Sequence, residues 1–192
     1  MIFVKPNNRA SSILRADQIA EKLNAKVYLN ELPDDVSRET VVFVKEVDPD
    51  LVIKASTQGA KIIYDPIDKF AYKERHGWQH WYYFVDEVIC FNEKMAEVLK
   101  QWFKSTVIIP HQWDARLNAQ AQMHTFLPAY IGHGFNCPPI VPWWDVSMIC
   151  APELMLDVAP TFNCHVSIRD PSTLQSMMKP ATKVSLAAAI GA

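Results

Sequence analysis

Acidic and imidazole side chains follow several short apolar runs in the first 114 residues of this 192-residue chain. In an open parallel sheet, ligands bind outside the carboxyl ends of the strands, so residues just after a strand are the first candidates for chemistry. Asp65 and Asp68 follow one such run, and His111 follows a later one. A carboxylate could accept the proton of a hydroxyl nucleophile or bind sugar hydroxyls, although Asp68 could equally cap the next helix. Asp65, Asp68 and His111 are the candidate catalytic residues.

Amide and cationic side chains occupy the same kind of position after other apolar runs. Asn8 and Arg9 follow the first run, and Lys45 follows the third. Together with the carboxylates, these groups predict an open cleft of mixed charge that suits a hydroxylated substrate. Polar residues accumulate wherever a strand meets a loop, so a purely structural role stays open for each of them.

Basic residues of the second half could bind a diphosphate. Arg169 follows a predicted strand, and Lys179 and Lys183 lie at the start of a predicted last helix, 179–192. Cations near a helix amino terminus act together with its N–H groups and its dipole on an anion. Solvent-exposed lysines on a helix surface are the alternative interpretation.

Two nucleotide-binding motifs are missing from the sequence. There is no G-x-G-x-x-G after the first apolar run and no G-x-x-x-x-G-K-[ST] anywhere, which argues against a dinucleotide cofactor and a P-loop nucleotide. His76 and His80 would share one helical face, but without an evident third ligand we expect packing and not a metal site. No cofactor or metal is therefore predicted.

An aromatic run and the cysteines are interpreted mainly as structural. Residues 78–84 contain five aromatic side chains, most of which we expect to pack between helix and sheet. One or two of them could instead form a sugar-stacking or membrane-facing surface. The four cysteines include no C-x-x-C pair, and Cys90 lies in an apolar run as a small hydrophobic residue would.

The elements that must position these residues alternate between strand and helix. Six β-rich runs are each followed by a turn: Ile2–Lys5, Lys26–Leu29, Val41–Lys45, Lys61–Tyr64, Glu87–Phe91 and Thr106–Ile109. This alternation predicts an α/β fold with a Rossmann-like, doubly wound parallel sheet, in which 106–109 is a buried strand. Asp48 and Asn92 are the expected caps of two helices, and Gly59 is expected to close the first of these. Residues 13–23 have helical spacing.

The predicted domains are a Rossmann-like domain over 1–113, a linker over 114–128 and a partial α/β domain over 129–192. In the last, strands are expected near Tyr130 and over 164–169. Such a domain would normally continue into another strand after its final helix, so we expect it to be incomplete at Ala192.

The bulk composition favours a folded cytoplasmic protein. With 49% hydrophobic and 21% charged residues, the chain can bury a core. The net charge of −2 provides no overall field for nucleic acid or an anionic membrane. Neither a secretory signal nor a run of about 18 apolar residues is evident, so peripheral contact is the membrane interaction left open.

In the order of these features the sequence resembles a GT-B glycosyltransferase of the family 4-like, group 1-like type. The segments that carry the resemblance are 15–23, 59–68, 85–92, 107–111, 130–132, 165–170, 179–183 and 187–192. It implies two Rossmann-like domains and transfer of a sugar from a nucleotide sugar to a hydroxyl acceptor. Arg15 would lie in the first helix of the acceptor domain and join Asn8, Arg9 and Lys45 in binding the acceptor. Arg169, Lys179 and Lys183 would hold the donor diphosphate.

The sequence departs from the family pattern at one pair of positions. Many retaining members carry two glutamates eight positions apart, and Met178 and Leu186 stand there in this chain. Two interpretations therefore remain: a glycosyltransferase-like enzyme, inactive if its donor site is truncated, or a non-catalytic α/β binding module or folded gene fragment. The second would pair as a homodimer through apolar surface that a missing element would cover.

Overall fold

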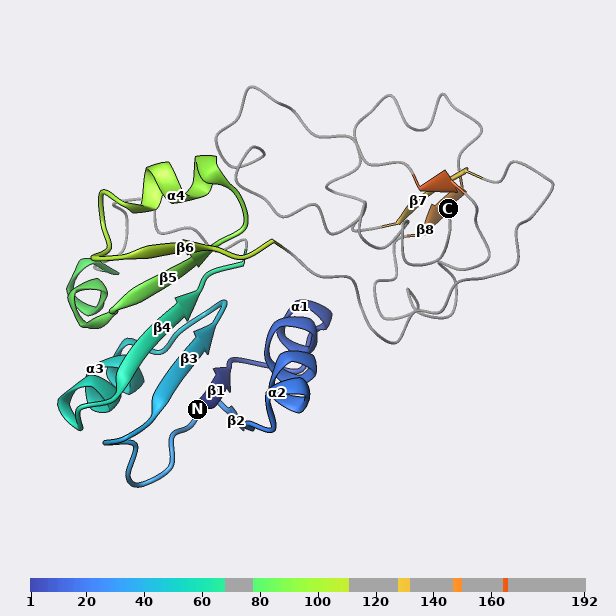
Figure 1. The fold of residues 1–192 in the computed structure, drawn as a ribbon. Helices are drawn as coiled ribbons and strands as arrows, with labels where there is room; N and C mark the ends of the chain where they lie inside the picture. Colours follow the sequence, from blue (N-terminus) through green and yellow to red (C-terminus); the bar gives the residue numbers. More distant parts are fainter. Residues whose placement is uncertain (68–77, 111–127, 132–146, 150–163, 166–192) are drawn as a thin grey trace. The chain divides into compact units, whose positions relative to one another are not determined.

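The computed structural model of the chain describes residues 1–67, 78–110, 128–131, 147–149 and 164–165 (Figure 1). The chain divides into two compact units, the first of which contains Met1–Pro110. The domain boundaries predicted from the sequence stay predictions, since most of 111–192 lies outside the described residues.

The first unit is built on a six-stranded sheet in which every pair of neighbouring strands is parallel. The strand order is β2-β1-β3-β4-β5-β6. The bounds are β1 Ile2–Lys5, β2 Lys26–Leu29, β3 Thr40–Val44, β4 Lys61–Asp65, β5 Glu87–Cys90 and β6 Thr106–Ile108. The α/β class, the parallel sheet and all six strands are confirmed, each within one residue of the expected bounds.

The central strands are apolar on both faces because helices cover both. Four consecutive residues of β3, Val41 to Val44, are buried, and so is all of β1. Continuous β-branched and aromatic runs of this kind are typical of parallel strands enclosed between helices. The edge strand β2 is at most half-buried at every position. The hydrophobic core therefore lies around β1, β3 and β4.

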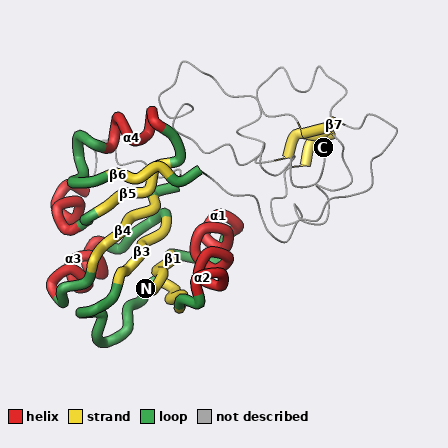
Figure 2. Tube along the Cα trace, viewed as in Figure 1, coloured by secondary structure: helices red, strands yellow, loops and turns green. Residues whose placement is uncertain are grey.

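Helices lie on both sides of the sheet, as Figures 1 and 2 show for α1 and α2 against α3. The chain moves from β1 to β2 in one direction and from β3 to β6 in the other, so right-handed crossovers place the helices on opposite faces. The helical bounds are α1 Ala10–Ser12, η1 Ile13–Asp17, α2 Gln18–Leu23, α3 Pro49–Thr57, η2 Trp78–Phe84 and α4 Glu93–Leu99.

Both predicted helix caps are present. The Asp48 side chain accepts a hydrogen bond from the N–H of Asp50 at the start of α3. The Asn92 side chain likewise accepts one from the N–H of Met95 at the start of α4. Gly59, two residues after α3 ends, has a φ of 91°, a conformation that glycine adopts without strain. These local signals fix where the two helices begin and where α3 ends.

The first helical segment differs from the expected regular helix. Its middle, η1, is a π-helical turn, in which the N–H of Gln18 donates to the carbonyl of Ile13. Leu23, expected on the apolar face, is 56% exposed at the end of α2. The prediction of a buried sixth strand was wrong as well, since Ile108 and Ile109 are 45% and 41% exposed. The reason is that β6 is the last strand of this sheet.

The aromatic run forms η2 and packs largely as expected. Trp81 and Tyr82 are buried, and the Tyr82 ring lies 4.5 Å from that of Trp81 and 4.8 Å from that of Phe103, centroid to centroid. Tyr83 differs because it is 72% exposed. The structural interpretation of the run therefore holds for Trp81, Tyr82 and the half-buried Phe84, which packs against the core, whereas Tyr83 lies on the surface.

The second unit contains a three-stranded parallel sheet with the order β8-β7-β9. Its strands are β7 Pro128–Ile131, β8 Ser147–Ile149 and β9 Cys164–His165. Strands were expected near Tyr130 and from Cys164 onwards, whereas β8 was not predicted. The linker 114–128 and the last helix, 179–192, fall almost wholly outside the described residues. In the described part of the chain no helix is long and apolar enough to cross a membrane.

Candidate functional site

The strand order places a topological switch point between β1 and β3. From β1 the chain passes to β2 on one side, whereas β3, β4, β5 and β6 follow in order on the other. The connections that leave the carboxyl ends of β1 and β3 therefore diverge to opposite faces, and doubly wound folds bind ligands in the crevice outside such a point. The side chains at the carboxyl ends of β1 and β3 form the candidate site.

The loop after β1 is organised by one amide side chain. The Asn7 Oδ1 accepts hydrogen bonds from the N–H of Arg9 at 3.0 Å and from the Ser12 hydroxyl at 3.2 Å. An asparagine that accepts from the backbone two residues on forms an Asx turn, which sets the direction of the chain into the helix. Asn8 and Arg9 lie exposed at this turn. The turn after β1 thus carries an exposed amide and an exposed guanidinium.

A hydrogen bond joins the two sides of the switch point. The Lys45 ammonium, directly after β3, donates to the Ser11 hydroxyl at 3.0 Å. The Lys45 backbone is fixed as well, since its N–H donates to the Asp65 carbonyl at 2.7 Å and its own carbonyl accepts from the Tyr64 hydroxyl at 2.9 Å. Its φ is 69°, a left-handed conformation that is uncommon outside glycine and recurs at functional sites. The loops after β1 and β3 therefore meet at the Lys45 side chain.

A second ammonium lies at the carboxyl end of β1. Lys5, the last residue of β1, is buried and donates to both carboxylate oxygens of Asp17 at 2.7 and 2.5 Å. Asp17 belongs to η1, so this ion pair ties the π-helical turn to the strand below it. The pairing neutralises a charge that would otherwise be costly to bury.

Arg15 and Asp65 form a buried ion pair across the same edge. The Arg15 Nε lies 2.7 Å from the Asp65 Oδ2, and both side chains are 1% exposed. The guanidinium also lies over the Phe91 ring, 5.2 Å from its centroid. Arg15 therefore links η1 to the ends of β4 and β5. The Arg15–Asp65 pair therefore holds η1 and β4 together, and solvent does not reach either side chain.

Burial and pairing act in opposite directions on the Asp65 carboxyl. Burial raises its pKa, while the Arg15 guanidinium and the N–H of Ile67, which donates to the Oδ1 at 3.3 Å, oppose the rise. Ile67 itself has a φ of 55°, which strains a β-branched residue. The turn after β4 is thus held in a costly conformation by its hydrogen bond to Asp65.

The structure brings together some of the residues predicted from the sequence. Asn8, Arg9 and Lys45 lie in the loops after β1 and β3, and Arg15 pairs with Asp65 inside the protein. The other predicted residues, Asp68, His111, Arg169, Lys179 and Lys183, lie outside the described residues. All of the assigned roles stay predictions.

Sequence reasoning did not single out the residues that support this site. Lys5 was assigned only to a strand, and neither Asp17 nor Tyr64 was given a partner. One signal was visible, since Lys5 is the sole charged residue of an otherwise apolar strand and needs a counter-ion if that strand is central. Its partner lies 12 residues away, and no local spacing identifies it.

Within the described ranges, no group of three or more His, Cys, Asp or Glu side chains could hold a metal ion. His80 is exposed, and His76 lies outside those ranges. Comparison of the chain with protein-family models and with curated proteins gave no match.

Proposed function

We propose that this protein is a GT-B-like glycosyltransferase that transfers a sugar from a nucleotide sugar to a hydroxyl acceptor. The observation that carries the proposal is the β1/β3 switch point, whose loops offer the Asn8 amide, the Arg9 guanidinium and the Lys45 ammonium. Such groups suit the hydroxyls of an acceptor. The sequence after β1 has no glycine-rich phosphate loop, so this crevice is better suited to an acceptor than to a dinucleotide.

The reaction requires one proton transfer and one leaving group. The acceptor oxygen forms a bond to the anomeric carbon of the donor sugar, and the bond from that carbon to the diphosphate oxygen breaks. The acceptor proton passes to a base, for which Asp68 and His111 are the proposed residues. The nucleoside diphosphate departs with its negative charge stabilised by Arg169, Lys179 and Lys183, which is usually the largest protein contribution to such a step.

Asp65, which the sequence analysis expected to be catalytic, has a different role in this proposal. Its carboxylate is 1% exposed and bonded to Arg15, so a substrate hydroxyl does not reach it in this arrangement. We therefore propose Asp65 and Arg15 as positioning residues that hold η1 and the turn after β4. Acceptor contact falls to Asn8, Arg9 and Lys45.

The same burial favours a second candidate function, a non-catalytic α/β binding module. Since the carboxylates of Asp65 and Asp17 are both held in ion pairs, the crevice could bind a hydroxylated ligand without activating it. This alternative predicts ligand binding at the β1/β3 crevice and no turnover of any nucleotide sugar.

Calorimetric titration of the full chain with UDP-glucose, UDP-N-acetylglucosamine and GDP-mannose tests the donor half of the proposal. Binding of at least one nucleotide sugar, and release of its nucleoside diphosphate on addition of a mixture of simple glycosides, is the expected result. Binding without release supports the binding module. Failure of all three donors to bind overturns the enzyme proposal.

Single substitutions test the acceptor half. Arg9→Ala and Lys45→Ala should each lower acceptor-dependent release about 10- to 100-fold and leave donor affinity unchanged, since a lost charged hydrogen bond costs about 1.5 to 3 kcal/mol. Lys22→Ala removes a matched exposed cation from the last turn of α2 and should change neither value. If all three substitutions had equal effects, the proposal that the loops after β1 and β3 bind the acceptor would be wrong.

A further inference from the structure

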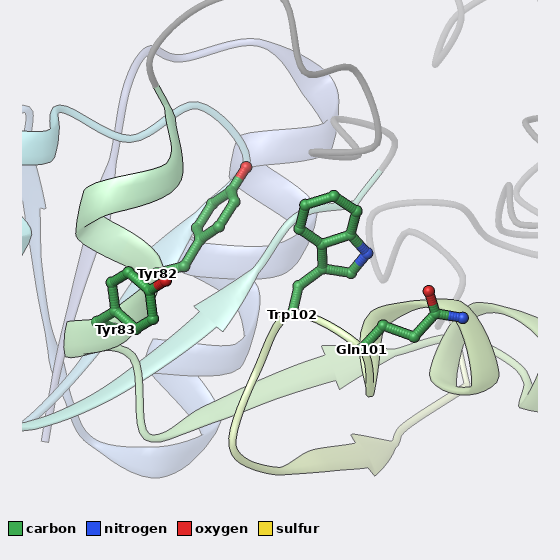
Figure 3. A pocket seen from close by; sticks show the side chains of 4 residues that line it. All are labelled: Tyr82, Tyr83, Gln101 and Trp102. Atoms are coloured by element: carbon green, nitrogen blue, oxygen red, sulfur yellow. The ribbon is translucent and has the colours of Figure 1, made fainter.

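A surface hollow of about 170 Å³ lies between η2 and the turn that follows α4 (Figure 3). It is lined by Tyr82, Tyr83, Gln101 and Trp102. Figure 3 shows that the two tyrosines come from η2, and that Gln101 and Trp102 come from the segment after α4. Two stretches far apart in the sequence thus build one concave surface with three aromatic side chains.

This hollow lies at the amino ends of the strands, whereas the switch point lies at their carboxyl ends. The η2 segment ends at Phe84 and leads into the start of β5 at Glu87, and Trp102 precedes the start of β6 at Thr106. The lining residues therefore lie near the amino ends of strands, whereas Arg9 and Lys45 lie after carboxyl ends. No residue is shared with the β1/β3 crevice.

Tyr83 is placed in a way that folding alone does not require. Its ring is 72% exposed, whereas its neighbours Trp81 and Tyr82 are buried. Trp102, which lines the same hollow, is half-buried, and Gln101 is exposed. Below them, the contacts of Tyr82 with Trp81 and Phe103 form a packed aromatic floor. An exposed ring on a rigid support is suited to stacking.

The lining is polar but carries no charge. Gln101 supplies an amide that can both donate and accept, and the buried Tyr82 hydroxyl has no hydrogen-bond partner in the part of the chain that the structure describes. Burial raises the pKa of Tyr82 to about 12, so this hydroxyl stays neutral at physiological pH. The exposed Lys100 flanks the segment and disfavours a cationic ligand, whereas the exposed Lys104 is paired with the Asp86 carboxylate at 3.8 Å.

We propose that this hollow binds one neutral pyranose ring, stacked on Tyr83 and Trp102 and hydrogen-bonded by the Gln101 amide. Aromatic faces for the apolar side of the ring and a donor-acceptor amide for its hydroxyls match the chemistry of a sugar. The volume is below the roughly 300 Å³ at which pockets for drug-sized ligands begin, so a single ring fits better than a nucleotide. The site would act as a secondary carbohydrate contact.

This inference is independent of the glycosyltransferase proposal. A ring bound at the amino ends of β5 and β6 contacts neither Arg9 nor Lys45. Either proposal can therefore fail while the other holds, and Lys45→Ala distinguishes them because it should leave the hollow unaffected.

Saturation-transfer NMR on the full chain with methyl glucoside, methyl mannoside and N-acetylglucosamine tests the site. At least one of these probes should receive saturation, with a dissociation constant in the millimolar range, as expected for about 4 kcal/mol of binding free energy. Tyr83→Ala should weaken binding at least tenfold, and Tyr83→Phe, which keeps the ring, should stay within about twofold. Gln101→Ala should weaken binding severalfold.

Controls address folding and ligand class. Leu23→Ala removes another exposed apolar side chain, at the end of α2, and should leave sugar binding unchanged. The unfolding midpoint of each variant shows whether it remains folded. If Tyr83→Ala does not fold, Trp102→Phe provides a second test of the stacking surface. The proposal is overturned if no probe binds at about 20 mM, if binding persists in both Tyr83→Ala and Gln101→Ala, or if tetramethylammonium binds in preference to the sugars.

Discussion

At the scale of single residues, the Arg15–Asp65 pair is the most consequential contact of the candidate site. Both groups are withdrawn from water, so their mutual attraction must offset two desolvation costs. Such a pair adds little net stability compared with apolar residues of the same volume. Breaking it is a different matter, because the remaining charge is then buried without a counter-ion.

Arg15→Met should therefore destabilise the protein by about 3 to 5 kcal/mol, measured by urea unfolding. The matched control is Lys94→Met, which removes the cation of the exposed pair with Glu97 and should cost under about 1 kcal/mol. The double variant Arg15→Met/Asp65→Leu should recover most of the loss. A loss below about 1 kcal/mol for Arg15→Met alone would show that Asp65 is solvated or has another partner.

Cys90 makes stability depend on pH in the alkaline range. Burial, followed by the nearby Asp65 charge, raises the pKa of its thiol from 9.0 to about 11, and Lys100 lowers it only in part. The unfolded chain loses this proton near pH 9 and the folded protein only near pH 11. The contribution of the Cys90 thiol to the free energy of unfolding is therefore fully present below pH 9. It is lost as the pH rises through 11, and the total loss is about 2 to 3 kcal/mol.

Urea unfolding at about pH 8 and about pH 10.5 measures this effect in the wild type and in Cys90→Ala. The variant is less stable at the lower pH because it leaves a small cavity, but its stability should fall less as the pH rises. Other groups that titrate in this range, Tyr82 among them, are present in both proteins and cancel in the comparison. Parallel declines of the two proteins would contradict the assignment to Cys90.

At the scale of elements, α3 shows how a capping residue that is visible in the sequence stabilises a helix. Asp48 adopts an extended backbone conformation and accepts from the N–H of Asp50, so it satisfies a donor that the helix itself cannot. Pro49 at the first helical position has no N–H to satisfy. The cap and the proline together define where α3 begins.

Asp48→Ala should destabilise the protein by about 1 kcal/mol, whereas Asp48→Asn, which keeps the acceptor, should cost a few tenths. Thermal unfolding of both variants provides the measurement. Lys54→Ala is the matched control, because it changes an exposed position of the same helix without touching its cap. Equal losses for the alanine and asparagine variants would assign the effect to charge and not to the hydrogen bond.

The contrast between α3 and η1 explains what the sequence could predict. The caps Asp48 and Asn92 act within three residues of themselves, so their role is visible in the local sequence. The π-helical turn carries Arg15 and Asp17, whose partners lie 50 and 12 residues away. No spacing within residues 10–23 encodes these pairings, and an ordinary helix was accordingly expected.

At the scale of the whole molecule, the order of the strands was the missing information. All six runs look suitable for a buried strand, and Thr106–Ile109 is the most apolar in appearance. Its exposure follows only from its place as the last strand of the first sheet. The candidate site has the same origin, since β1 and β3 are neighbours although β2 separates them in the sequence. Residues after strands could be chosen in advance, but not which of them would meet.

The strand order also predicts how the first sheet opens. Strand β3 is paired on both sides, with β1 and β4, and its residues Val41 and Val44 are fully buried, so its amides should exchange only on global unfolding. Strands β2 and β6 are each paired on one side and partly exposed, so their amides should exchange through smaller openings. Hydrogen exchange read by mass spectrometry should therefore show peptides of β3 and β4 as the slowest.

The outcome at β6 bears on self-association. If its peptide exchanges faster than that of β3 at every protein concentration, the exposed Ile108 and Ile109 face solvent, as described. If its protection instead rises with concentration, a second copy covers this edge, since an unpaired strand is a ready template for another chain. Ile108→Lys should then abolish the concentration dependence, because a charge on an edge strand opposes such pairing. Protection equal to that of β3 and independent of concentration would contradict the assignment of β6 as an edge strand.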